Sequence, residues 1–155
     1  MGALRLNKGS QVIQPGGGER LSIGAATVTV KLSGDHTAGT LALIDYEVPA
    51  GFPGPPLHVH PDHDELFIVL GGRIGLRLGD EAVTATAGTM AYVAGHDPHT
   101  FANPHDEPAR MLVAITPAGF EAFFRDVAAH SADGPLGPEI LARLNRDHGV
   151  ELVPS

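Results

Sequence analysis

Short apolar runs separated by turn residues fill the middle of the chain and constrain its fold more than any other feature. They lie at residues 65–70, 73–78, 81–86, 89–93, 99–102 and 110–116. Gly, Pro, Asn and Asp are frequent between them. Many short strands at such close spacing indicate an all-β sandwich or barrel. We therefore predict a domain built on antiparallel β-structure.

Two earlier segments extend this pattern towards the N-terminus. Residues 21–32 show strand-like alternation that is broken at Gly24, and a turn follows at residues 34–36. Residues 40–48 predict another strand. Because successive side chains of a strand point to opposite faces, Leu41, Leu43, Asp45 and Glu47 should share one face. The other face would carry Ala42, Ile44, Tyr46 and Val48.

The apolar period changes from strand-like to helical after residue 116. Residues 118–130 carry Phe120, Phe123, Phe124 and Val127 at helical spacing, and the preceding proline can open a helix. Residues 138–148 predict a second short helix. We expect a barrel over about residues 19–116, with helices over about 117–148 packed outside it. The aromatic stripe is interpreted as core packing against the sheet in preference to a partner-binding surface.

Length and composition limit what the chain can do. Its 155 residues fit one domain over residues 1–155, and the formal net charge of −8 without a Lys/Arg run argues against nucleic-acid and anionic-membrane partners. Small-molecule substrates fit better. The absence of cysteine excludes disulfides, thiolate metal ligands and a cysteine nucleophile. The N-terminal residues contain no signal-peptide pattern and no stretch approaches membrane-spanning length, so a cytoplasmic location is expected.

Four residues at suggestive spacing form the candidate functional site. His58 and His60 flank Val59, so on a strand both imidazoles point into the same cavity. Glu65 can return on the next strand, and His99 follows in a later turn-rich segment. Three imidazoles and one carboxylate suit one divalent transition metal ion, namely Mn, Fe, Co, Ni, Cu or Zn. Such a set leaves coordination positions open, which favours chemistry over structural support.

The alternative is that these histidines fall close together by chance. The chain has nine histidines, and a lone His-x-His motif is a weak signal. The prolines at 55 and 56 and the glycines at 71 and 72, which bracket the two strands, favour a built site.

The same residues resemble the two conserved motifs of the cupin superfamily. The first motif corresponds to the stretch from Gly54 to Gly72, and the second to the stretch from Gly88 to Asn103. Within this superfamily, the chain is similar to small single-domain bacterial quercetinase-like cupins. It departs from the motifs in loops: the opening Gly falls at Phe52, and a Pro and a Gly of the second motif fall at Ala94 and His96.

The resemblance implies a small antiparallel jelly-roll barrel in which His58, His60, Glu65 and His99 surround a metal. Strand parity then predicts which apolar side chains face the same interior. If Glu65 faces the interior, Phe67 and Val69 of its strand do so too. If His99 faces the interior, so does Phe101. The predicted substrate pocket consists of Phe67, Val69, Leu76, Leu78 and Phe101.

The remaining histidines are treated individually. His63 lies in a polar turn between two predicted ligands, and His96 lies shortly before His99. Each could act beside the metal, although an exposed loop side chain is the favoured interpretation of both. Solvated side chains are expected for His36, His105, His130 and His148. Asn103 precedes a proline, so its amide is expected to satisfy backbone groups at a strand end.

The function that the resemblance implies is a metal-dependent dioxygenase. In it, the metal and Glu65 would bind and deprotonate a small hydroxylated or enolizable, partly aromatic substrate. Metal-assisted isomerisation or hydrolysis without oxygen remains open. So does a non-catalytic ligand-binding or sensing module, although no DNA-binding segment is evident. A structural or storage role ranks last.

We also expect a homodimer, with residues 21–32 pairing or swapping across the dimer.

Overall fold

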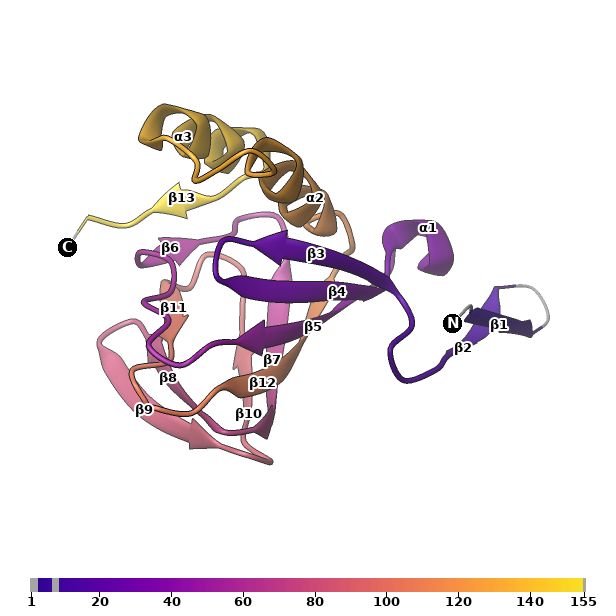
Figure 1. Cartoon of the computed structure of the whole chain (residues 1–155), viewed down its shortest axis with the longest axis horizontal. Coiled ribbons are helices and arrows are strands. Elements are labelled where there is room, and N and C mark those ends of the chain that lie inside the picture. Colours follow the sequence, from indigo (N-terminus) through magenta and orange to yellow (C-terminus); the bar gives the residue numbers. More distant parts are fainter. Residues whose placement is uncertain (1–2, 7–8, 155) are drawn as a thin grey trace.

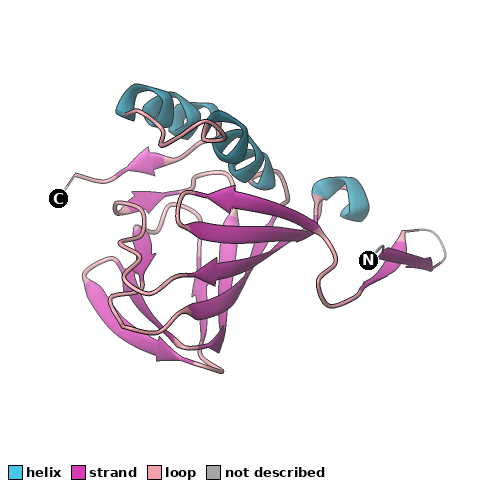
Figure 2. Cartoon of the chain, in the orientation of Figure 1, coloured by secondary structure: helices cyan, strands magenta, loops and turns pink. Residues whose placement is uncertain are grey.

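The computed structural model describes residues 3–6 and 9–154, and it shows two antiparallel sheets packed face to face (Figure 1). Strands dominate, and two C-terminal helices lie together at one end of the two sheets (Figure 2). The predicted jelly-roll β-barrel with helices outside is therefore confirmed. In the part of the chain that is described, no helix is long and apolar enough to cross a membrane.

The larger sheet has six strands in the order β10-β7-β12-β5-β4-β3. Its strands are β3 (Glu19–Ile23), β4 (Ala26–Leu32), β5 (Ala42–Val48), β7 (Asp64–Gly71), β10 (Met90–Val93) and β12 (Ala109–Thr116). Neighbours that are far apart in sequence, such as β12 between β5 and β7, give the sheet its long-range connectivity. The predicted strands agree with these bounds to within a few residues, and the break at Gly24 separates β3 from β4.

The smaller sheet has five strands in the order β13-β6-β11-β8-β9. Its strands are β6 (His58–Val59), β8 (Arg73–Leu78), β9 (Glu81–Thr86), β11 (His99–Ala102) and β13 (Glu151–Leu152). A separate hairpin of β1 (Ala3–Leu6) and β2 (Ser10–Ile13) lies at the N-terminal end, to one side of the two sheets (Figure 1). The sequence predicted neither this hairpin nor β13.

The core lies between the two sheets and follows from strand alternation. The face of β5 that carries Ala42, Ile44, Tyr46 and Val48 is buried along its whole length. Ile74 and Leu76 of β8 are buried in the same core cluster. Since burying a large aliphatic side chain stabilises the fold by roughly 1.5–3 kcal/mol, this shared interior fixes the register of both sheets.

The first C-terminal helix begins later than predicted. α2 spans Glu121–His130, whereas the aromatic period suggested a start at residue 118. The Glu121 carboxylate is buried and accepts hydrogen bonds from the backbone N–H groups of Gly34 and Gly119, at 2.6 and 2.5 Å. These bonds hold residues 117–120 as a turn. Phe124 of α2 is buried in the core, which confirms the interpretation of the aromatic stripe as packing.

The remaining short elements differ modestly from expectation. α3 spans Pro138–Asp147 and ends one residue before the predicted limit, with Gly149 adopting a φ of 71° just beyond it. α1 (Gly34–Thr37) is one helical turn at the place where a simple turn was predicted.

Asn103 organises the loop that leaves β11, as the sequence predicted. It is fully buried, and its amide donates to the carbonyl oxygens of Pro49 and Glu107 at 3.1 and 2.8 Å. Its side-chain oxygen accepts the backbone N–H of His105 at 3.0 Å. The residue therefore joins the backbone at Pro49 to the loop over residues 105–107.

Replacing Asn103 with Ala should lower the free energy of unfolding by about 1–3 kcal/mol, because buried backbone groups would lose their partners. Urea denaturation followed by circular dichroism measures the change. Asp106→Ala, an exposed substitution in the same loop, is the control. Equal stability of the Asn103 and Asp106 variants would refute this role.

Candidate metal centre

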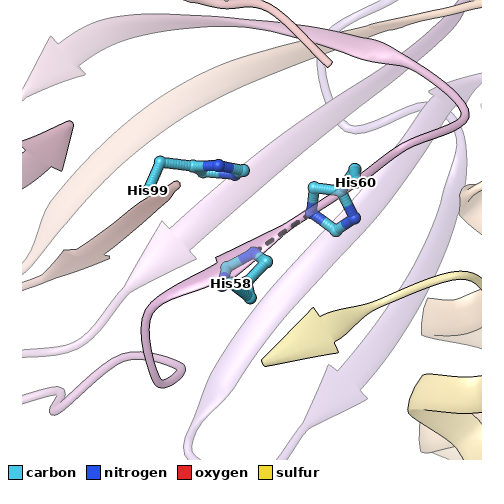
Figure 3. Close-up of side chains that lie close together, drawn as sticks. All are labelled: His58, His60 and His99. Carbon is cyan, nitrogen blue, oxygen red and sulfur yellow. Dashed lines mark hydrogen bonds between the residues drawn. The ribbon is translucent and has the colours of Figure 1, made fainter. Parts of the chain in front are cut away.

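The four predicted ligands converge from both sheets onto one interior point. His58 on β6 and His99 on β11 stand directly opposite each other in the smaller sheet. Glu65 projects from β7 of the larger sheet, and His60 follows β6 at the start of the connecting turn. All four are buried, with 3–6% of each residue exposed. Figure 3 shows the three imidazoles facing one another.

The distances between the donor atoms are short. His58 Nε2 lies 3.1 Å from His60 Nε2, and His60 Nε2 lies 3.3 Å from Glu65 Oε1. His99 Nε2 lies 3.4 Å from Glu65 Oε2. Two ligands held about 2.1 Å from a metal are about 3.0 Å apart at a right angle and about 3.4 Å apart at a tetrahedral angle. The observed separations fall in this range, so the donor set fits a transition metal ion.

Backbone carbonyl groups orient two of the imidazoles. His58 Nδ1 lies 2.7 Å from the carbonyl oxygen of Pro56, and His99 Nδ1 lies 3.0 Å from that of Asp97. An Nδ1–H that donates to a carbonyl leaves the Nε2 lone pair free for a metal. His99 Nε2 is buried without a hydrogen-bond partner among the described residues. A metal ion would satisfy that atom.

Burial also sets the protonation states of the site. It lowers the pKa of His58 and lowers the pKa of His60 to about 3, which keeps both rings in the neutral form that binds metal. Burial alone would raise the pKa of Glu65, but the hydrogen bond from His63 and the other adjacent histidines lower it. Glu65 is therefore an ionised carboxylate.

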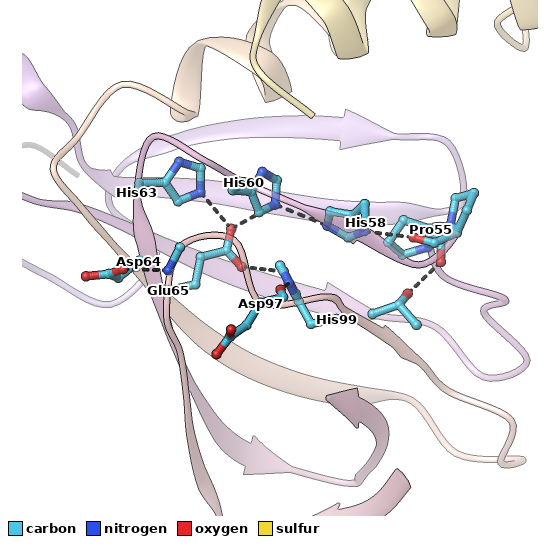
Figure 4. Close-up of polar contacts among 11 residues, drawn as sticks. Pro55, His58, His60, His63, Asp64, Glu65, Asp97 and His99 are labelled. Carbon is cyan, nitrogen blue, oxygen red and sulfur yellow. Dashed lines mark hydrogen bonds and ion pairs between the residues drawn. The ribbon is translucent and has the colours of Figure 1, made fainter. Parts of the chain in front are cut away.

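His63 is buried, contrary to the expectation of an exposed turn side chain. Its Nε2 lies 3.1 Å from Glu65 Oε1 (Figure 4). The ring also packs on His60 and on Phe120, with centroid distances of 4.5 and 5.0 Å. The turn folds back onto the site and under the start of α2, and local sequence gave no signal of that long-range contact.

A cavity of about 70 Å³ adjoins the donor atoms. Two of the predicted pocket residues, Phe67 and Phe101, line it. The other three do not line it: Val69 and Leu76 are buried at other positions in the core, and Leu78 is half-buried beside it. The lining residues that were not predicted as pocket walls are Tyr46, Pro55, Val113 and Phe124.

The strand face that carries Tyr46 could be read from the sequence. The sequence did not show where the side chains of the other three lining residues would lie. Val113 lies on β12 and Phe124 on α2, and only the folded chain brings them beside the histidines. A strand pattern gives the face of a residue but not its neighbours across the barrel.

The other histidines lie apart from the donor cluster. His96 is exposed and has a φ of 72°, the left-handed conformation that favours glycine, at the position where the family motif carries one. His130 is exposed as predicted. The expectation of solvated side chains is wrong for His36, His105 and His148, which are half-buried. His148 packs against α2, where its Nε2 lies 2.6 Å from an Asp126 carboxylate oxygen.

Comparison with known proteins places this geometry in context. Residues 44–115 match the family model described as "Cupin domain". No curated protein matches the chain. Among solved structures, a sugar phosphate isomerase from Silicibacter pomeroyi is 22% identical, with 68% of this chain and 74% of that chain covered and a TM-score of 0.57.

Two further structures are similar over most of their length. A predicted oxalate decarboxylase from Thermotoga maritima is 19% identical, with 68% of this chain and 98% of that chain covered and a TM-score of 0.61. An RmlC-like cupin from Shewanella frigidimarina is 18% identical, with 70% and 93% covered and a TM-score of 0.59. At these identities the likeness establishes a shared fold.

The arrangement predicts that the protein binds one divalent metal ion per chain and is stabilised by it. Added Co²⁺ or Ni²⁺ should raise the melting temperature, because a metal that binds the folded state shifts unfolding by mass action. His60→Ala should weaken binding by more than about 100-fold and abolish the rise. Calorimetric titration and thermal melts measure both effects, with exposed His130→Ala as control. Equal metal affinity of the two variants would refute this ligand assignment.

Proposed function

Because this chain belongs to the cupin superfamily, we propose that it is a mononuclear metal-dependent enzyme acting on a small hydroxylated or enolizable molecule. The observation that carries this proposal is the buried carboxylate of Glu65 beside three converging imidazoles. A structural site has no need of an adjoining cavity, whereas a catalytic one needs room for a substrate beside the metal.

The residues of the chain divide the work in this proposal. His58, His60 and His99 would hold the metal, which when bound supplies Lewis acidity towards a substrate oxygen. Glu65 would contribute a carboxylate oxygen close enough to accept a proton from a hydroxyl or a carbon acid. Phe67 and Phe101 would exclude water from the same space and so strengthen each polar interaction within it.

The size of the cavity limits the substrate. Pockets for drug-sized ligands begin at roughly 300 Å³, and the cavity here measures about 70 Å³. A compact acid, enol or hydroxy-ketone of a few carbons fits such a space. A three-ring flavonol does not fit unless the walls move, so we propose a substrate smaller than those of quercetinases.

Among reactions, we place an oxygenase first, as the resemblance to quercetinase-like cupins implies. The small cavity favours a second candidate, an isomerisation, hydrolysis or decarboxylation that needs no oxygen. Two proteins of similar fold are described as a sugar phosphate isomerase and a predicted oxalate decarboxylase. Oxygen consumption during turnover separates the two candidates.

A ligand-binding module without catalysis is the remaining alternative. It would bind the same small molecules and release them unchanged.

We also propose a homodimer, because β3 lies at the edge of the larger sheet and the backbone groups of an edge strand can pair with another chain. A cytoplasmic location remains part of the proposal.

Glu65→Gln tests the proposed chemistry. The amide keeps the shape of the side chain but cannot act as a carboxylate base, so turnover should fall by about 10²–10⁴-fold in a variant that still binds metal. An oxygen-electrode and product screen over small enols, hydroxy acids and flavonols identifies the reaction first. Glu139→Gln, an exposed change on α3, is the matched control. Unchanged turnover would exclude Glu65 as the base, and absence of turnover on every substrate would favour the binding module.

A further inference from the structure

We propose that His63 is a positioning residue for Glu65: its Nε2–H holds one carboxylate oxygen and thereby fixes the orientation of the carboxylate at the metal position. This inference rests on the proposed metal site. It adds a fifth residue, which contacts a ligand without itself binding the metal.

The contact geometry is specific. His63 Nε2 lies 3.1 Å from Glu65 Oε1, while Glu65 Oε2 faces His99 Nε2 at 3.4 Å. Oε1 also lies 3.3 Å from His60 Nε2, so the bond from His63 holds the carboxylate with both of its oxygens beside proposed metal ligands. Both His63 and Glu65 are buried, so no solvent competes for the hydrogen bond between them.

Packing on both sides fixes the ring of His63. It stacks on His60 with an interplanar angle of 27°, and it also contacts Phe120. Phe120 in turn meets the edge of His60, with ring centroids 4.6 Å apart. Because the ring is held by these neighbours, its N–H direction is set independently of the carboxylate.

The donor atoms form two overlapping triads that share His60. One consists of His58, His60 and His99, and the other of His60, His63 and Glu65, each with its atoms within 4.8 Å of one another. The first triad supplies three nitrogens for a metal. In the second, His63 engages the carboxylate, and this contact fixes the orientation of Glu65 relative to the first triad.

Removing the donor should release the carboxylate. With Oε1 free, Glu65 could rotate and present either or both oxygens to the metal, so the coordination of the metal would change along with its affinity. Loss of a group that orients a metal ligand typically weakens metal binding by about 10–100-fold. A residue that served only as packing would leave the coordination unchanged.

The test uses the full chain loaded with Co²⁺, whose visible absorption reports the number and geometry of its ligands. His63→Phe keeps an aromatic ring for stacking and removes the donor, and His63→Gln restores an N–H near the same place. His96→Gln is the matched control, since that histidine lies exposed in the loop before His99. Competition with a chelator gives the affinities.

We expect His63→Phe to bind Co²⁺ about 10–100-fold more weakly with an altered spectrum, and His63→Gln to recover the wild-type spectrum and most of the affinity. Wild-type affinity and spectrum in His63→Phe would overturn the proposal. If His63→Phe fails to fold, His63→Gln decides alone, and an altered spectrum in that folded variant overturns it. Electron–nuclear double resonance that detects one fewer nitrogen bound to Co²⁺ in both variants would make His63 a ligand and would also overturn the proposal. Failure of the wild-type protein to bind Co²⁺ would instead refute the metal site itself.

Discussion

The placement of one ionised carboxylate in an apolar interior governs the rest of this structure. A buried charge without partners costs several kcal/mol, so Glu65 is tolerated only because hydrogen-bond donors surround it. The histidines at 60, 63 and 99 supply that environment within 3.1–3.4 Å. These imidazoles would in turn be costly to bury in a charged form, and burial keeps His60 neutral. The ionised carboxylate alone would favour a protonated His60, and the effect of burial outweighs it.

The barrel makes this cluster possible by bringing two sheets to a common interior. The register that sets His58 opposite His99 comes from the pairing of β6 with β11. Glu65 enters from the opposing sheet, between the pairings of β7 with β10 and β12. Gly95 completes the arrangement, because a side chain there would press against the carbonyl oxygens of His60 and His63. Because Gly95 has no side chain, the loop before His99 can lie directly on the turn that carries His60 and His63.

Strand parity explains how much of this could be predicted from the sequence. Within a strand, position determines the face, so the inward direction of His58, Phe67 and Phe101 followed from alternation alone. His63 lies in a turn, where no such period applies. Its burial depends on Phe120, which follows it by more than fifty residues. The two-residue strand β13 was missed for a related reason, because so short a segment carries no period.

The contrast between local pattern and long-range contact also applies to the cavity beside the proposed ligands. The matched cupin domain ends at residue 115 and contains every proposed metal ligand, together with Tyr46 and Val113 of the cavity wall. Phe124, which lines that cavity, and Phe120, which packs on His60 and His63, lie in the segment that follows. Glu121 anchors that segment through its hydrogen bonds to Gly34 and Gly119. The barrel therefore holds every proposed metal ligand, and α2 contributes to the wall of the adjoining cavity. Changes in this segment could alter the accepted substrate while leaving the donor set intact.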